Sequence, residues 1–132
     1  MVYLPDTNEI SAYFQQRNAV LAGRFAAAFP HLRLSVLVLA ELESGAAKSG
    51  VLRHRSRIEG FLAHVAVEPF IVEDSGRFGR LRAELERRGE LIGTLDLLIA
   101  AQALRLGATV VTHNIEAFSR VPGLKVEDWQ SA

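Results

Sequence analysis

The sequence predicts an α/β fold in which a short central parallel sheet is covered by helices on both faces. Strand-like and helix-like segments alternate along all 132 residues, and parallel strands need helical crossover connections of this kind. In addition, residues 93–112 combine a strongly apolar helix with a β-branched strand that follows it directly, which is the typical unit of such folds.

Length and composition limit the class of protein. A chain of 132 residues fits one domain spanning residues 1–132, and 49% hydrophobic with 23% charged residues is typical of globular proteins. No apolar run reaches the ~20 residues needed to cross a bilayer, and the N-terminus shows no basic stretch followed by an apolar signal core. The lack of cysteine excludes disulfides and thiolate metal sites and fits a cytoplasmic protein.

The N-terminal half is expected to contain two strands and four helices. A first strand ends at Pro5, after which Asp6, Thr7 and Asn8 offer three consecutive helix-capping residues. Pro30 closes the second helix, because proline cannot continue a helical hydrogen-bond pattern. The expected strands are residues 2–4 and 32–37, and the expected helices are one that starts at the Asp6 cap and those at 19–28, 38–47 and 51–64.

The C-terminal half is expected to contain three strands and three helices. Pro69 interrupts a strand-like stretch, which therefore belongs near the edge of the sheet. An amphipathic helix follows, with Phe78, Leu81 and Leu85 along one stripe, and ends at Gly89. The expected strands are a short one within 65–72, 109–112 and 124–126, and the expected helices are 73–88, the helix of the 93–112 unit, and a short turn at 114–118.

The helix of the 93–112 unit carries one unusual residue. Thr94 is a natural N-cap and Gly107 a natural C-terminal stop. The helix is apolar on almost every face, which indicates deep packing, yet its first turn contains Asp96. A carboxylate near buried surface is costly unless positive charge meets it; the helix dipole supplies part of that charge, and a metal ion would supply much more.

Other polar side chains are predicted to lie at the same edge of the sheet as Asp96. In parallel α/β sheets, ligands bind beyond the carboxyl ends of the strands. Asp6 follows the first strand, Glu41 lies in the helix after the second, and Thr112 and Asn114 follow the strand before the short helical turn. Crowded carboxylates either hold a hard divalent cation such as Mg²⁺ or Mn²⁺ or share protons as an acid–base pair; Thr112 and Asn114 would position a water or act as neutral ligands.

Each of these residues also has a structural interpretation. Asp6 can simply cap a helix, Asp96 can complement a helix dipole, and Asn114 can be a turn residue. Glu41 is harder to explain in this way because apolar residues flank it. These structural interpretations do not require the residues to lie at the same edge of the sheet. Their predicted convergence on one edge therefore favours a functional site.

The remaining polar residues give weaker indications. Among the four histidines, only His113, beside Asn114, is placed to touch a phosphate, and no nucleophilic triad or glycine-rich phosphate loop is present. Fifteen basic and fifteen acidic residues cancel, but thirteen of the basic residues are arginine, which binds phosphate in a two-pronged geometry. Solvated helix faces with ion pairs one turn apart explain these arginines equally well. The arginine groups are residues 53/55/57, 77/80/82 and 87/88.

Four segments of the chain carry a recognisable set of motifs. They are Leu4-Pro5-Asp6-Thr7-Asn8, Leu39-Ala40-Glu41-Leu42 with Gly45, Asp96-Leu97-Leu98-Ile99-Ala100-Ala101, and Val111-Thr112-His113-Asn114 with Phe118. Together they resemble the motifs of PIN-domain ribonucleases, and most closely those of the VapC toxins of bacterial toxin–antitoxin systems. The closing stretch 121–129 is similar to that group as well, so the resemblance covers essentially the whole chain.

The resemblance implies a three-layer α/β/α sandwich and endonucleolytic RNA cleavage that depends on Mg²⁺ or Mn²⁺. It also implies a homodimer and inhibition by a VapB-like antitoxin, through which the pair represses its own operon. Asp6, Glu41 and Asp96 match the acidic metal ligands of the family, and Thr112 matches a hydroxyl that orients Asp6 or a water. Asn114 stands where many members carry a fourth acid, which leaves a second metal open.

Two positions depart from the family pattern. Pro5 and Glu9 stand where an apolar residue is more usual; Glu9 either faces solvent or alters the geometry of the ligands. The hypothesis is a metal-dependent endoribonuclease toxin, with Arg82, Arg87 and Arg88 guiding RNA or meeting an acidic stretch of the antitoxin. The alternatives are a catalytically silent module whose carboxylates anchor an arginine of the antitoxin, and a phosphatase acting on small phosphoesters.

Overall fold

The computed structural model describes residues 1–131. Its strands form two parallel sheets, a three-stranded one in the order β1-β4-β5 and a two-stranded one that pairs β2 with β3. A parallel bridge between Tyr3 and Leu32 joins the two sheets, so the strand order across the molecule is β3-β2-β1-β4-β5. The strands are β1 Tyr3–Pro5, β2 Arg33–Ser35, β3 Ala66–Glu68, β4 Thr109–Val111 and β5 Lys125–Glu127.

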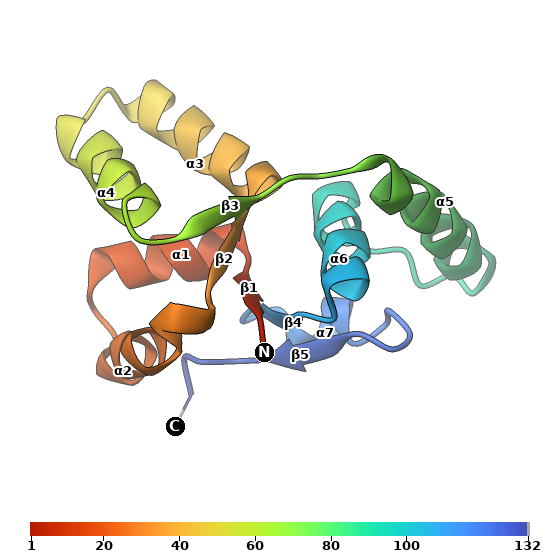
Figure 1. Ribbon diagram of the computed structural model, residues 1–132. Helices are drawn as coiled ribbons and strands as arrows, with labels where there is room; N and C mark the ends of the chain where they lie inside the picture. Colours follow the sequence, from red (N-terminus) through yellow and green to blue (C-terminus); the bar gives the residue numbers. More distant parts are fainter. Residues whose placement is uncertain (132) are drawn as a thin grey trace.

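The helices lie on both sides of this sheet (Figure 1). Helices α1 to α4 lie on one side of the strands, with α3 and α4 forming an arm that extends from it, and α5 and α6 lie on the other. This arrangement confirms the predicted three-layer α/β/α class. The helices are α1 Thr7–Gln15, α2 Ala19–Ala28, a 3-10 turn at Phe29–His31, α3 Val36–Ser49, α4 Leu52–Leu62, α5 Val72–Arg87, α6 Thr94–Leu106 and α7 Ile115–Phe118.

Capping side chains explain where the structure departs from the predicted boundaries. The hydroxyl of Ser35 accepts a hydrogen bond from the amide of Leu37, so α3 begins at Val36 and residues 36–37, predicted as strand, are helical. Gly93, not Thr94, is the N-cap of α6, and Thr94 is its first helical residue. Strand β1 covers Tyr3–Pro5, one residue later at each end than the expected 2–4, and Pro5 is its last residue.

Several predicted details are confirmed. Asp6 caps α1, and Gly107 ends α6 in the left-handed conformation with φ of 63° that glycine tolerates best. Strand β3 is at the end of the strand order and stops before Pro69, as an edge strand should. Within the predicted stripe of α5, Leu85 is fully buried, whereas Phe78 and Leu81 are only partly so.

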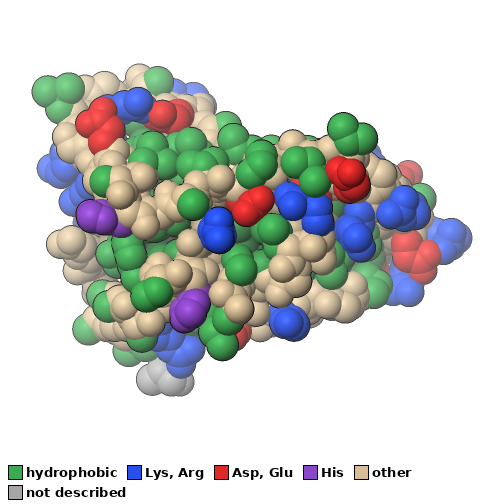
Figure 2. Space-filling view, viewed as in Figure 1, with side chains coloured by type: hydrophobic (Ala, Val, Ile, Leu, Met, Phe, Trp, Pro, Cys, Tyr) green, Lys and Arg blue, Asp and Glu red, His purple; other side chains and the backbone are tan. Residues whose placement is uncertain are grey.

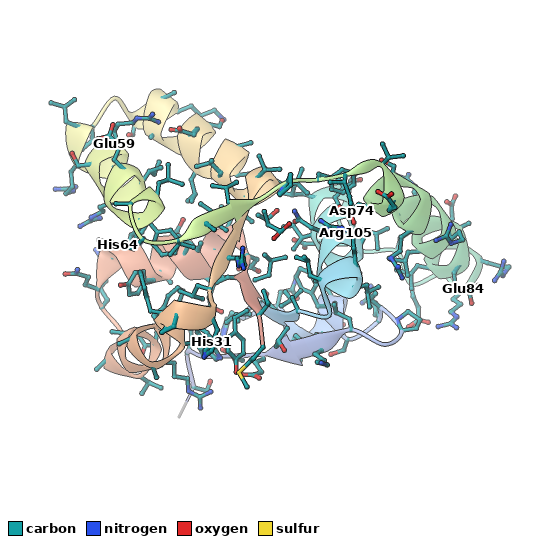
Figure 3. All side chains as sticks on the ribbon, viewed as in Figure 1. His31, Glu59, His64, Asp74, Glu84 and Arg105 are labelled. Atoms are coloured by element: carbon teal, nitrogen blue, oxygen red, sulfur yellow. The ribbon has the colours of Figure 1, made fainter. Side chains whose placement is uncertain are left out.

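A polar cluster inside the core ties α5 and α6 to the end of β3 (Figure 3). Asp74 is fully buried. Its carboxylate accepts hydrogen bonds from Arg105 Nε at 2.7 Å and from the amide of Ile71 at 3.0 Å. Arg105 also donates to the carbonyl of Pro69 at 3.1 Å. Gln102, one turn earlier on α6 and fully buried, donates to the carbonyls of Glu68 and Pro69. These hydrogen bonds hold α5 and α6, the helices that connect β3 to β4, on the side of the sheet opposite α1.

Arg82, Arg87 and Arg88, near the C-terminal end of α5, make ion pairs with glutamates of that helix. Arg88 Nε lies 3.0 Å from a carboxylate oxygen of Glu84, Arg87 contacts the same carboxylate, and Arg82 lies 4.0 Å from Glu86. Figure 2 shows basic and acidic side chains interleaved over this end of the molecule. The pairs lie on an exposed helix face, as the structural interpretation of these arginines expects.

Candidate active site

Asp6 is held rigidly at the carboxyl end of β1. Its amide donates to the carbonyl of Val111 at 3.0 Å, which continues the β1–β4 ladder by one bond. Its side chain is 7% exposed and accepts two hydrogen bonds, from the amide of Glu9 to Oδ1 at 2.9 Å and from Thr112 Oγ1 to Oδ2 at 2.6 Å. Both carboxylate oxygens are therefore oriented by donors, which favours the ionised form.

Thr112 orients Asp6 from the end of β4. Its hydroxyl is fully buried and accepts a hydrogen bond from the amide of Asn114 at 2.9 Å while it donates to Asp6. Because the incoming amide occupies an acceptor position of the hydroxyl, its single proton is directed toward Asp6. Thr112 therefore donates to Asp6, and the orienting role that the family resemblance implies for this hydroxyl stays a prediction.

Glu41 reaches the same place from α3, but not because it is buried. Helical periodicity places Val38 and Leu42 in the core and leaves Glu41 exposed, although apolar residues flank it in the sequence. Glu41 Oε1 instead accepts a hydrogen bond of 2.5 Å from Thr7 Oγ1, at the start of α1. This bond turns the carboxylate toward the residue that follows Asp6.

Asp96 completes the group from the first turn of α6, where it is half-buried. Together with Asp6 and Glu41 it lines an open cavity of about 340 Å³. The other lining residues are Thr7, Asn8, Gly93, Thr94 and Leu95. The predicted convergence of three carboxylates from separate elements is therefore present in the structure.

Burial and mutual repulsion act on these carboxyl groups. The pKa of Asp6 is raised mainly by burial and further by the charge of Glu41, against the lowering effect of its hydrogen bonds from Thr112 and Glu9. The pKa of Asp96 is raised by burial and then by the charges of Asp6 and Glu41. A cation in the cavity would relieve this repulsion and favour both ionised forms.

The side chains fit a hard divalent cation that keeps part of its water shell. Within residues 1–131, no three acidic or imidazole side chains are close enough to ligate one ion together. Mg²⁺ is commonly bound through only one or two carboxylates, with water or phosphate oxygens at its other positions. Carboxylates around an open cavity match that mode and do not match a fully protein-enclosed ion.

Comparisons with known proteins identify the family. The model of the PIN domain matches residues 3–124. The chain is 33% identical over 128 residues to the tRNA(fMet)-specific endonuclease VapC of Salmonella typhimurium, covering 96% of this chain and 97% of that protein. It is 40% identical over 99 residues to Ribonuclease VapC2 of Rickettsia felis, 74% of each chain. This chain is a PIN-domain ribonuclease of the VapC family.

Solved VapC structures share the whole architecture. The chain matches the VapBC2 complex of Rickettsia felis bound to a promoter DNA fragment, with a TM-score of 0.90 and 33% identity over 98% of this chain and 99% of that one. It matches DNA-bound VapBC of Salmonella typhimurium with a TM-score of 0.91 and 32% identity over 98% of each chain. PIN-domain nucleases generally use divalent metal ions.

Two residues singled out in the sequence lie beside the cavity rather than in it. Asn114 is exposed and is not among the residues lining the cavity; it acts on the group through its backbone amide. His113 is exposed and its Nδ1 lies 3.1 Å from Asp128 Oδ2. In this VapC-family chain, neither side chain takes the place of a fourth acid lining the cavity.

Sequence reasoning missed the position of Glu9. The side chain is wholly buried, 0% exposed, so the solvent-facing alternative was wrong, and an effect of Glu9 on the geometry of the ligands stays a prediction. Its carboxylate accepts a hydrogen bond from Gln130 Nε2 at 2.7 Å. Asp6 and Glu9 have the spacing of a capping box, which would have indicated a surface role, and no local signal points to a partner 121 residues away.

Replacing Thr112 with valine is expected to impair both stability and cleavage. The variant keeps the shape of the side chain but leaves the amide of Asn114 without its acceptor and Asp6 without its shortest donor, at a cost of about 1–3 kcal/mol. Loss of the donor also raises the pKa of Asp6 further, so cleavage should fall most steeply on the acidic side of its pH profile. Urea denaturation and RNA cleavage rates measure the two effects.

Thr112→Ser is the matched control, because serine keeps the hydroxyl and loses only a methyl group. It should retain the pH profile of the wild-type protein. A valine variant whose pH profile overlays the wild-type curve would contradict the orienting role of the hydroxyl.

Proposed function

We propose that this protein is the toxin of a VapBC-type pair and that it hydrolyses RNA phosphodiester bonds at the cavity between Asp6, Glu41 and Asp96. The observation that carries the proposal is the convergence of these carboxylates, from three separate elements, on one open cavity. The VapC relatives that match nearly the whole chain support the same activity. Residues 1–132 would act as one PIN-like unit.

Asp6 and Asp96 would hold Mg²⁺ or Mn²⁺, with Glu41 either binding the ion through one of its waters or orienting the attacking water, because no three acidic side chains of residues 1–131 lie close enough to ligate one ion together. A bound divalent ion supplies charge neutralisation on the phosphodiester and increases the acidity of a bound water. The chain's own contribution is positional: Thr112 and the Glu9 amide fix both oxygens of Asp6, and Thr7 turns Glu41 toward the cavity. Asn114 supports Thr112 through its amide.

The partners are proposed from the similar complexes. VapBC assemblies with 32–33% identity and TM-scores near 0.9 support a VapB-like antitoxin as the protein partner of this chain. We also propose that the antitoxin binds a homodimer of the toxin, as the family resemblance implies. A relative named as a tRNA(fMet)-specific endonuclease makes initiator tRNA the first RNA to test. Within residues 1–131 no helix is long and apolar enough to cross a membrane, and we propose that the toxin acts in the cytoplasm.

The activity is tested by incubating the purified protein with a labelled pool of cellular RNA and with initiator tRNA. Cleavage is expected with Mg²⁺ or Mn²⁺ and is expected to stop with EDTA, because carboxylates alone cannot neutralise the phosphodiester. Folded protein that binds Mn²⁺ but cuts no RNA would contradict the nuclease and favour the silent antitoxin-binding module. Turnover of a small chromogenic phosphate without RNA cleavage would favour the phosphatase.

A further inference from the structure

Glu9 occupies an unusual position for a carboxylic acid. It is the third residue of α1, it has 0% exposure, and its amide donates to Oδ1 of Asp6. Burial raises the pKa of Glu9, and the nearby charges of Asp6 and Asp128 act in the same direction. Placing an acid here is costly, because an apolar side chain would fill the space without losing hydration. The carboxyl group therefore needs a reason to be here.

The carboxyl group of Glu9 does not have the usual function of an acid at this position of a helix. A glutamate in the third position normally accepts a hydrogen bond from the amide of the capping residue. Here the amide of Asp6 donates to Val111 in the neighbouring strand. Glu9 is consequently directed inward, where Oε1 accepts the hydrogen bond from Gln130 Nε2 at 2.7 Å.

Gln130 is itself held in place from several directions. Its carbonyl accepts a hydrogen bond from Asn18 Nδ2 at 3.0 Å, and its amide donates to Asp128 Oδ1 at 2.9 Å. The preceding residue, Trp129, is 3% exposed and packs edge-on against Tyr3 and Phe25, with ring centroids 5.1 and 5.3 Å apart. Gln130 therefore presents its side-chain amide to Glu9 from an anchored backbone.

We propose that the Glu9–Gln130 hydrogen bond is a latch by which the C-terminal segment positions Asp6. The latch holds the first turn of α1 in place. Because the Glu9 amide donates to Oδ1 of Asp6, the position of that turn sets the orientation of the Asp6 carboxylate. Glu9 and Gln130 are positioning residues, since neither lines the cavity. The inference rests on the proposed role of Asp6 as a metal ligand.

The test compares Gln130→Ala, Glu9→Ala and the double variant with the wild-type protein. Hydrogen exchange of the Glu9 amide, followed by NMR, reports the bond to Asp6 without any metal, and we expect exchange to accelerate roughly tenfold in each variant. Loss of a group that orients a metal ligand typically weakens metal binding by about 10-fold or more, which Mn²⁺ titration followed by electron paramagnetic resonance measures. For RNA cleavage, kcat should fall and KM should change little.

Two controls separate positioning from general destabilisation. Glu9→Gln keeps an oxygen that accepts from Gln130 and removes the charge, so Mn²⁺ affinity and amide exchange should stay close to wild type. Gln102→Ala removes the hydrogen bonds of another buried glutamine, on the opposite side of the sheet, and should lower Tm without changing Mn²⁺ affinity.

The latch predicts non-additivity, since either single variant already breaks the one bond. The proposal would be overturned if the effects of the two single variants on amide exchange and Mn²⁺ affinity added up in the double variant. It would also be overturned if Gln130→Ala lowered Tm and left Glu9 amide exchange and Mn²⁺ affinity unchanged. If wild-type protein bound no Mn²⁺ while Glu9 amide exchange still accelerated in the variants, the metal role of Asp6 would fail and the latch would stand.

Discussion

Replacing Asp96 with asparagine is expected to reduce RNA cleavage by on the order of 100- to 1000-fold, because it weakens binding of the metal ion that would stabilise charge in the transition state. The side chain keeps its size, and the loss of its negative charge relieves repulsion with Asp6 and Glu41. The variant should therefore melt at the same temperature as the metal-free wild-type protein or higher. Cleavage assays with Mn²⁺, paired with circular dichroism melting in EDTA, measure both effects.

The pH dependence of stability is the control for this interpretation. The folded protein binds protons at Asp6 and Asp96 more tightly than the unfolded chain does, because both pKa values are raised in the fold. Stability from these groups is fully present below the unfolded pKa and is lost as pH rises through the raised folded pKa. The loss should be smaller in Asp96→Asn. An Asp96→Asn variant that cleaves RNA at the wild-type rate would contradict the proposed role of Asp96 as a metal ligand. A variant that melts in EDTA well below the melting temperature of the wild-type protein would also contradict it.

Replacing Arg105 with alanine is expected to cause the largest loss of stability of the changes considered, about 3–5 kcal/mol. The change leaves Asp74 as a buried carboxylate without its cation and removes the hydrogen bond to Pro69. Because this cluster holds α5 and α6 to the end of β3, the loss should appear as a lower midpoint of urea denaturation.

Arg88→Ala is the comparison, since Arg88 pairs with Glu84 on an exposed helix face. Exposed pairs contribute about 0–1 kcal/mol, so this variant should unfold nearly as the wild-type protein does. Equal destabilisation by the two alanine variants would show that burial of the Asp74–Arg105 pair has no special effect.

The sequence predicted the parts of the site that follow from topology. Alternating strands and helices place residues after parallel strands at one edge, and Asp6, Glu41 and Asp96 do line one cavity there. Glu41 lies at the predicted edge because its helix follows the second strand. Its apolar neighbours in the sequence did not indicate that the helical period turns Glu41 to solvent between buried Val38 and Leu42.

The parts that could not be predicted depend on partners far apart in the chain. Asp74 and Arg105, 31 residues apart, look like ordinary surface charges until α5 packs against α6. The burial of Glu9 likewise depends on Gln130, which lies at the other end of the sequence. Local patterns specify a helix start or a strand end, whereas the identity of a buried polar partner depends on tertiary packing.

The pairing of β1 with β4 also has a consequence for how the enzyme matures during synthesis. Asp6 emerges from the ribosome more than a hundred residues before its partners, since its amide donates to Val111 and its side chain accepts from Thr112. Sheet pairing across more than a hundred residues cannot form before that late segment has been translated. A nascent chain therefore carries the Asp6 carboxylate without the strand that orients it, and the toxin gains its assembled site only after strand β4 has been translated.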